Sequence, residues 1–127
     1  MGGAPLMLVL EIAIAGAAGA MLRSIVDTLV RQRSNETLPR GTLTINVTGS
    51  FVLGIVTGLA LYHGLGADSR AVYGTGFCGG YTTFSTFAYQ TVRLGEQHAY
   101  SGAWRNIAAS LVLPAAAAAL GLALTAW

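Results

Sequence analysis

Four long apolar runs, joined by short polar connections, limit the folds that are open to this chain. They cover residues of about 6–30, 42–63, 71–92 and 103–127. Each has roughly the 20 residues that a helix needs to cross about 30 Å of hydrocarbon. Only 9% of the 127 residues are charged, whereas about a quarter are charged in a typical soluble domain. The sequence therefore predicts an all-α membrane protein with four transmembrane helices, in a single domain over residues 1–127.

The third apolar run contains a polar, glycine-rich stretch, GFCGGYTTFSTFAY, at residues 76–89. Glycines weaken a helix, and Ser and Thr hydroxyls compete for backbone hydrogen bonds. Broken helix at membrane depth is tolerated only where protein buries it or where it lines an aqueous cavity. Such breaks leave carbonyls that can hold a cation and N–H groups that can face an anion. We predict that the third helix is broken near its middle and coordinates an ion; a packing surface without an ion is the alternative.

Uncharged polar residues recur at helical spacing in the second and fourth runs. Thr42, Asn46 and Ser50 share one helix face. Asn106 and Ser110 repeat the spacing of four residues. A buried Asn offers two N–H donors and needs several partners. Asn46 therefore either joins helices by a hydrogen bond or presents a neutral donor to a permeating solute.

Phe84 and Phe87 follow the glycines and share a helix face because they are three residues apart. The edge of an aromatic ring carries positive partial charge, so two such edges can contact a small anion in a nearly dry site. Core packing is the commoner role of such a pair. Small residues at a spacing of four, as at Gly16 and Gly54, let helices approach closely, either within one chain or between subunits. Four short helices can hardly enclose a polar path, so a transporter of this size is expected to be a homo-oligomer.

The charged residues bear on orientation and on mechanism. Five arginines flank the first and third connections, against Arg70 on the opposite side, which predicts that the first and third connections are cytoplasmic. Arg23 and Asp27 can pair at a spacing of four, which leaves Glu11 as the remaining carboxylate within a span. A small proton-coupled multidrug exporter that uses Glu11 is the alternative function, and a non-transporting scaffold subunit is a third. The residues contain no set typical of an enzyme or a nucleic-acid partner.

Two motifs together resemble those of the Fluc (CrcB) family of fluoride channels. They are GTLTINVTG, at residues 41–49, and GFCGGYTTFSTFAYQT, at residues 76–91. The earlier GAAGAMLR, which ends at Arg23, is similar to the first span of that family, so the resemblance covers nearly the whole chain. It implies an antiparallel, dual-topology homodimer in the cell (inner or plasma) membrane, with two fluoride pores and a structural sodium ion (Na⁺) between the subunits. The implied function is passive, fluoride-selective efflux that lowers cytoplasmic fluoride and its toxicity.

The resemblance also implies roles for individual residues. The pore would be formed by the amide of Asn46, the rings of Phe84 and Phe87, and the hydroxyls of Thr42 and Ser110. Arg23 would lie in a vestibule. The backbone carbonyls of Gly79 and Thr82 would bind sodium.

Three features depart from the family pattern. Pro114 stands where a second hydroxyl of the fourth span is expected, and Gln90 stands where some members carry a glutamate. The arginine distribution predicts one orientation, whereas the resemblance implies two.

Overall fold

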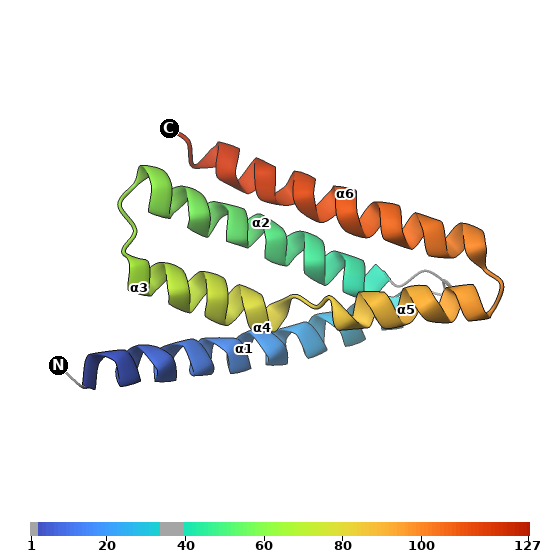
Figure 1. The fold of residues 1–127 in the computed structure, drawn as a ribbon, viewed down its shortest axis with the longest axis horizontal. Coiled ribbons are helices and arrows are strands. Elements are labelled where there is room, and N and C mark those ends of the chain that lie inside the picture. The colour runs from blue at the N-terminus through green and yellow to red at the C-terminus, as the bar shows by residue number, and fades with distance from the viewer. Residues whose placement is uncertain (1–2, 34–39) are drawn as a thin grey trace.

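The computed structural model describes residues 3–33 and 40–127, and all the regular structure in these two ranges is helical. The helices form four rods, which run roughly parallel to one another in Figure 1. In chain order they are α1 (Gly3–Arg33), α2 (Arg40–Tyr62), α3 (Ala67–Arg70), the π-helix η1 (Ala71–Cys78), α4 (Gly79–Tyr81), α5 (Ser85–Glu96) and α6 (Tyr100–Leu124). Most of the connection predicted between the first two spans falls in residues 34–39, outside the described residues.

Three of the rods are single helices that are long and apolar enough to cross a membrane: α1 from Ala4, α2 and α6. Their bounds lie within a few residues of the predicted spans, and α1 extends three residues beyond the prediction at each end. The fourth rod consists of α3, η1, α4 and α5 in succession (Figure 1). None of these pieces reaches the length of a span alone, because the chain leaves the helix between α4 and α5.

The break in this rod confirms the prediction of a discontinuous third helix. The turns before it are already wide, since the N–H of Gly79 donates to the carbonyl of Gly74, five residues back. Helix α4 ends at Tyr81, and Thr82 has extended backbone, with φ −81° and ψ 159°. π-helical turns are uncommon and are frequent at functional sites. Because α4 ends at Tyr81 and α5 begins at Ser85, the non-helical residues of the break are Thr82, Thr83 and Phe84.

Glycines set how closely the rods pack, and they do so within one chain. A Cβ atom at Gly80 would overlap the carbonyl oxygen of Gly16, which joins α1 to α4. A Cβ atom at Gly54 would overlap the carbonyl oxygen of Ala118, and one at Gly121 would overlap that of Phe51, which joins α2 to α6. Backbones that approach this closely gain van der Waals contact that lipid cannot replace. The small-residue motifs around Gly16 and Gly54 therefore pack the subunit itself.

The ends of the rods agree with the predicted sides of the connections. Figure 1 shows the end of α1, the start of α2 and the turn between α5 and α6 at one end of the bundle. The described helix ends that flank the first and third connections, with their five arginines, thus share one end of the bundle. Large apolar side chains cover the outside of the bundle; Ile14 of α1 is 69% exposed and Leu111 of α6 is 62% exposed. Such a surface suits contact with lipid tails.

Candidate functional site

A groove of about 240 Å³ opens on the bundle where α2, the break, α5 and α6 meet. Uncharged side chains form its walls: Asn46, Ser50, Leu53, Thr82, Thr83, Phe84, Phe87, Ser110, Leu111 and Pro114. The groove therefore combines amide, hydroxyl and aromatic groups with apolar ones, and none of the described ionisable side chains lines it. Four residues predicted for the pore, Asn46, Phe84, Phe87 and Ser110, come together there, although they lie on three different rods.

Asn46 holds the backbone of the break with two hydrogen bonds. Its Nδ2 donates to the carbonyl oxygen of Thr83 at 2.9 Å, and its Oδ1 accepts the N–H of Thr83, also at 2.9 Å. These bonds replace the helical partners that Thr83 loses at the break, so the backbone polar groups stay satisfied at membrane depth. An amide has two N–H donors, and the second hydrogen on Nδ2 has no partner among the described residues. Both predicted roles of Asn46, helix joining and donor in a polar site, are therefore open to the same side chain.

Thr83 is a site residue that the sequence prediction did not single out. Its side chain is 9% exposed, and its Oγ1 accepts the N–H of Thr86 at 3.3 Å. Such a bond satisfies a donor in the first turn of α5, as an N-cap hydroxyl does. The Oγ1 of Thr83 also lies 3.3 Å from Ser85 Oγ and donates to Thr86 Oγ1 at 3.2 Å. The hydroxyls of Thr83, Ser85 and Thr86 thus form a connected cluster beside the groove.

Phe84 and Phe87 lie on the wall of the groove as a tilted pair. Their ring centroids are 5.6 Å apart, with 59° between the ring planes. This arrangement lies within the range of favourable edge-to-face aromatic contacts. Phe84 is 76% exposed, so core packing within the subunit does not explain its position. One ring of the pair is therefore presented outward, at the mouth of the groove.

Ser110 connects the groove to a buried polar chain between α5 and α6. Its Oγ donates to Asn106 Oδ1 at 3.4 Å, and Asn106 Nδ2 donates to Thr91 Oγ1 at 2.8 Å. Thr91 in turn donates to the carbonyl oxygen of Phe87 at 2.9 Å. Helix α6 continues through Pro114, which lacks the N–H that would otherwise bond the carbonyl of Ser110. Thr91 was not predicted, because its partner Asn106 is fifteen residues away on another helix.

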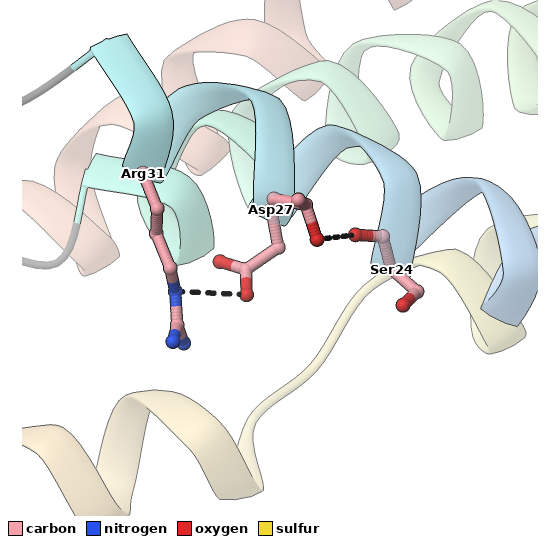
Figure 2. A network of polar contacts seen from close by, with 4 residues as sticks. Ser24, Asp27 and Arg31 are labelled. Atoms are coloured by element: carbon pink, nitrogen blue, oxygen red, sulfur yellow. Dashed lines mark hydrogen bonds and ion pairs between the residues drawn. The ribbon is translucent and has the colours of Figure 1, made fainter.

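Two predicted pore or vestibule residues lie outside the groove. Thr42 is 3% exposed at the start of α2, one turn before Asn46, and it does not line the groove. Arg23 is half-buried on α1, also away from the groove lining. The prediction that Asp27 pairs with Arg23 is wrong. Asp27 Oδ2 lies 3.0 Å from Arg31 Nε instead, as Figure 2 shows for the end of α1.

Helix geometry leaves this choice open, since both arginines are four residues from Asp27. A carboxylate favours the partner on its C-terminal side, and the observed pair follows that preference. Asp27 also lies against the start of α2, where a Cβ atom at Gly41 would overlap Asp27 Oδ1. A negative charge at that helix N-terminus is favourable.

The carbonyls predicted to bind sodium belong to Gly79, the first residue of α4, and to Thr82, the residue that follows α4. The N–H of Thr83, which would bond the Gly79 carbonyl in a continuous helix, donates to Asn46 instead. The N–H of Thr86, which would bond the Thr82 carbonyl, donates to Thr83 Oγ1. Gly79 is exposed, and a Cβ atom there would have no neighbour within 4 Å. Neither of these two carbonyl oxygens therefore has a hydrogen-bond donor among the described residues.

Gln90 carries a buried polar atom that the subunit does not satisfy. Its Oε1 has no hydrogen-bond partner among the described residues. Gln90 lies three residues after Phe87 on α5, and it is the residue noted above as a departure from the family pattern.

Comparison with known proteins gives one consistent result. The family model described as CrcB-like protein, Camphor Resistance (CrcB), matches residues 10–122. The chain is 52% identical over 116 residues to a protein of Leifsonia xyli named fluoride-specific ion channel FluC 1, which covers 91% of this chain and 85% of that protein. It is 48% identical over 106 residues to FluC 2 of Mycobacterium bovis, with 84% and 81% covered, and 45% identical over 120 residues to FluC 1 of Frankia casuarinae, with 87% and 91% covered. This chain belongs to the CrcB family.

Proposed function

We propose that this protein is a fluoride-specific ion channel that lets fluoride leave the cell passively and so limits its toxicity. The observation that carries the proposal is the groove, in which uncharged donors and two phenyl rings converge. Relatives of this protein in the CrcB family are named fluoride-specific ion channels. The chain is therefore a transport protein of the membrane and not an enzyme.

The groove chemistry suits a small anion that holds its hydration water tightly. The free N–H of Asn46, the hydroxyl of Ser50 and the ring edges of Phe84 and Phe87 all offer positive partial charge. Ser110 joins them when its hydroxyl turns away from the long, 3.4 Å bond to Asn106. Together they replace part of the water shell without the deep trap that a buried cationic side chain would make. Conduction needs binding that is strong enough for entry and weak enough for exit. Neutral groups meet both conditions.

We place this channel in an antiparallel homodimer that spans the cell membrane in dual topology. The groove is open on one side, with Phe84 76% exposed at its mouth. A second copy closes the groove, and its two-fold symmetry gives two equivalent pores. The five arginines at one end of each subunit oppose equal insertion in both orientations, so the contact between antiparallel copies must supply the compensating free energy.

A structural sodium ion at the centre of this dimer fits the residues present. Unwound backbone carbonyls are the groups that hold sodium within broken membrane helices. The carbonyls of Gly79 and Thr82 lack hydrogen-bond donors among the described residues, and the open space at Gly79 leaves room for an ion. Two oxygens from each of two subunits would give a four-oxygen site. The ion would be coordinated by these carbonyl oxygens and would link the break of one subunit to the break of the other.

The rival proposal, a proton-coupled exporter, depends on the depth of Glu11. Helix α1 has 31 residues, which is about 46 Å at 1.5 Å per residue, so it exceeds a hydrocarbon layer of about 30 Å by about 8 Å at each end if centred. Glu11 is eight residues from the helix start, or about 12 Å, which puts it only about 4 Å inside the hydrocarbon. It is exposed, and it does not line the groove. A carboxylate so near the boundary reaches water by extending its side chain.

A flux measurement with the Glu11→Gln variant tests the proposed function against this rival. Purified protein in liposomes is expected to release trapped fluoride, measured with a fluoride electrode, and to retain chloride. Glu11→Gln is expected to release fluoride at the wild-type rate, because Glu11 is remote from the groove. Proton-driven uptake of a cationic dye that disappears in Glu11→Gln, with no fluoride release by either protein, would establish the exporter instead.

Phe84→Ile tests the role of the exposed ring. Isoleucine keeps an apolar side chain of similar size but removes the positive ring edge, so fluoride release is expected to fall about tenfold or more, the equivalent of about 1.4 kcal/mol. The variant should still elute as a dimer in size-exclusion chromatography. Leu111→Ile, an aliphatic exchange on the same groove, is the control and should conduct normally. Dissociation of Phe84→Ile into monomers would instead assign Phe84 to subunit packing.

A further inference from the structure

Helix α2 holds both flanks of the break, through two side chains that are two residues apart. Asn46 bonds Thr83, after the extended residue Thr82. Thr48 bonds Tyr81, the last residue of α4 before it, with 2.8 Å between Thr48 Oγ1 and the Tyr81 hydroxyl. Neither Tyr81 nor Thr48 lines the groove. The pair therefore affects the groove only through the backbone that it holds.

The direction of the second bond follows from the other contacts of Thr48. Its hydroxyl donates to the carbonyl oxygen of Thr44 at 2.8 Å and lies 3.2 Å from that of Ile45. A hydroxyl has one hydrogen, and either hydroxyl can donate in the bond between Thr48 and Tyr81. Donation by Tyr81 satisfies every group, because it leaves the Thr48 hydrogen to these carbonyls. Since the phenol of Tyr81 is 6% exposed, the bond also satisfies a polar group that would be costly to bury alone.

The surroundings of Tyr81 leave its side chain little other freedom. Its ring stacks on Phe77, with centroids 6.0 Å apart and 8° between the planes. The ring also lies against α2 at Gly49, where a Cβ atom would overlap the methyl of Thr82 and crowd the Tyr81 ring. Thr82 itself donates from Oγ1 to the Cys78 carbonyl at 2.8 Å. Packing sets the position of the ring, and the hydrogen bond fixes the end of α4 against α2.

We infer that Thr48 and Tyr81 are a positioning pair that sets the geometry of the break, and with it the carbonyl of Thr82 and the ring of Phe84. The inference rests on the proposed function, since it concerns conduction through the groove. Loss of the bond leaves the ring stacked on Phe77 of the same rod but lets the end of α4, with that ring, shift against α2. Small displacements of a binding site are costly in transfer reactions, and a permeation site made of a few partial charges is equally sensitive.

Three variants test the pair in planar-bilayer recordings of fluoride current. Tyr81→Phe and Thr48→Val each remove the bond and keep most of the packing, and each is expected to lower the current about three- to tenfold, as the loss of one hydrogen bond allows. The double variant is expected to be no worse than either single variant, because the two changes remove the same interaction. Thr48→Ser keeps the hydroxyl and should conduct as the wild type does. Tyr62→Phe, which removes an exposed hydroxyl from α2, is the matched control.

Sodium dependence separates positioning from a general loss of stability. Sodium is expected to protect the dimer against thermal dissociation, and the concentration that gives half of the full protection should rise at least threefold in Tyr81→Phe. In saturating sodium the melting temperature of this variant should equal that of the wild type. Wild-type current and sodium dependence in both single variants would overturn the inference. So would a loss of current in the double variant that equals the sum of the single losses and that parallels a fall in melting temperature. If the wild-type protein conducts no fluoride, the proposed function fails first; if it conducts and Tyr81→Phe matches it, only the positioning pair fails.

Discussion

Asn46→Asp is expected to reduce fluoride conduction about a thousandfold. The exchange keeps the size of the side chain and places a negative charge in a groove that no ionisable residue lines. Two unit charges about 4 Å apart repel by about 4 kcal/mol at an effective dielectric constant of about 20, and each 1.4 kcal/mol in a barrier changes a rate about tenfold. The same exchange removes the N–H that bonds the Thr83 carbonyl, so an oxygen then faces an oxygen. Fluoride-electrode release from liposomes measures the effect.

The neutral variant Asn46→Leu separates these two causes. Leucine fills similar space and loses both bonds to Thr83, but it adds no charge. If charge repulsion dominates, Asn46→Leu should retain at least tenfold more fluoride release than Asn46→Asp at equal dimer content. Equal losses in the two variants would show that holding the break is the main role of Asn46. Wild-type release by Asn46→Asp would remove Asn46 from the fluoride path altogether.

Much of the architecture follows from the sequence because the signals are local. Hydrophobic length located the helices to within a few residues, since a membrane span imposes it on each segment separately. The break was located because Gly79, Gly80 and the hydroxyls after them are consecutive. Local patterns also indicated that Asn46, Phe84, Phe87 and Ser110 matter, although only the fold shows that they share a groove.

The parts that the sequence did not predict depend on partners distant in the chain. Asn46 and Thr83 are 37 residues apart. Their two hydrogen bonds can form only where α2 lies beside the break in one particular register. The pairing of Asp27 with Arg31 rather than Arg23 was undetermined because both lie at helical spacing. Thr42 shares a helix face with Asn46, yet the entry of α2 into the bundle buries it away from the groove. The spacing of residues in the sequence indicates which of them share a helix face, but not which other helix packs against that face.

The close approach of α1 and α4 gives the second large expected effect, through Gly80→Ala. Alanine normally stabilises a helix relative to glycine by about 0.4–1 kcal/mol, through the unfolded chain. At Gly80 the added methyl would overlap the backbone carbonyl of Gly16, which cannot rotate away as a side chain can. The helices must separate, at a cost of about 3 kcal/mol or more. We expect a clear fall in the melting temperature of the detergent-solubilised protein, and loss of the dimer.

Gly95→Ala is the matched control, because it makes the same chemical change in α5, where the new methyl would meet no atom of another described helix within 4 Å. This variant should melt at or slightly above the wild-type temperature. The contrast isolates helix contact from helix propensity, since propensity acts in the same direction at both positions. Equal behaviour of the two variants would mean that α1 and α4 do not meet at Gly16 and Gly80. The groove would then lack its support, because the break that Asn46 and Thr48 hold from one side is held by α1 from the other.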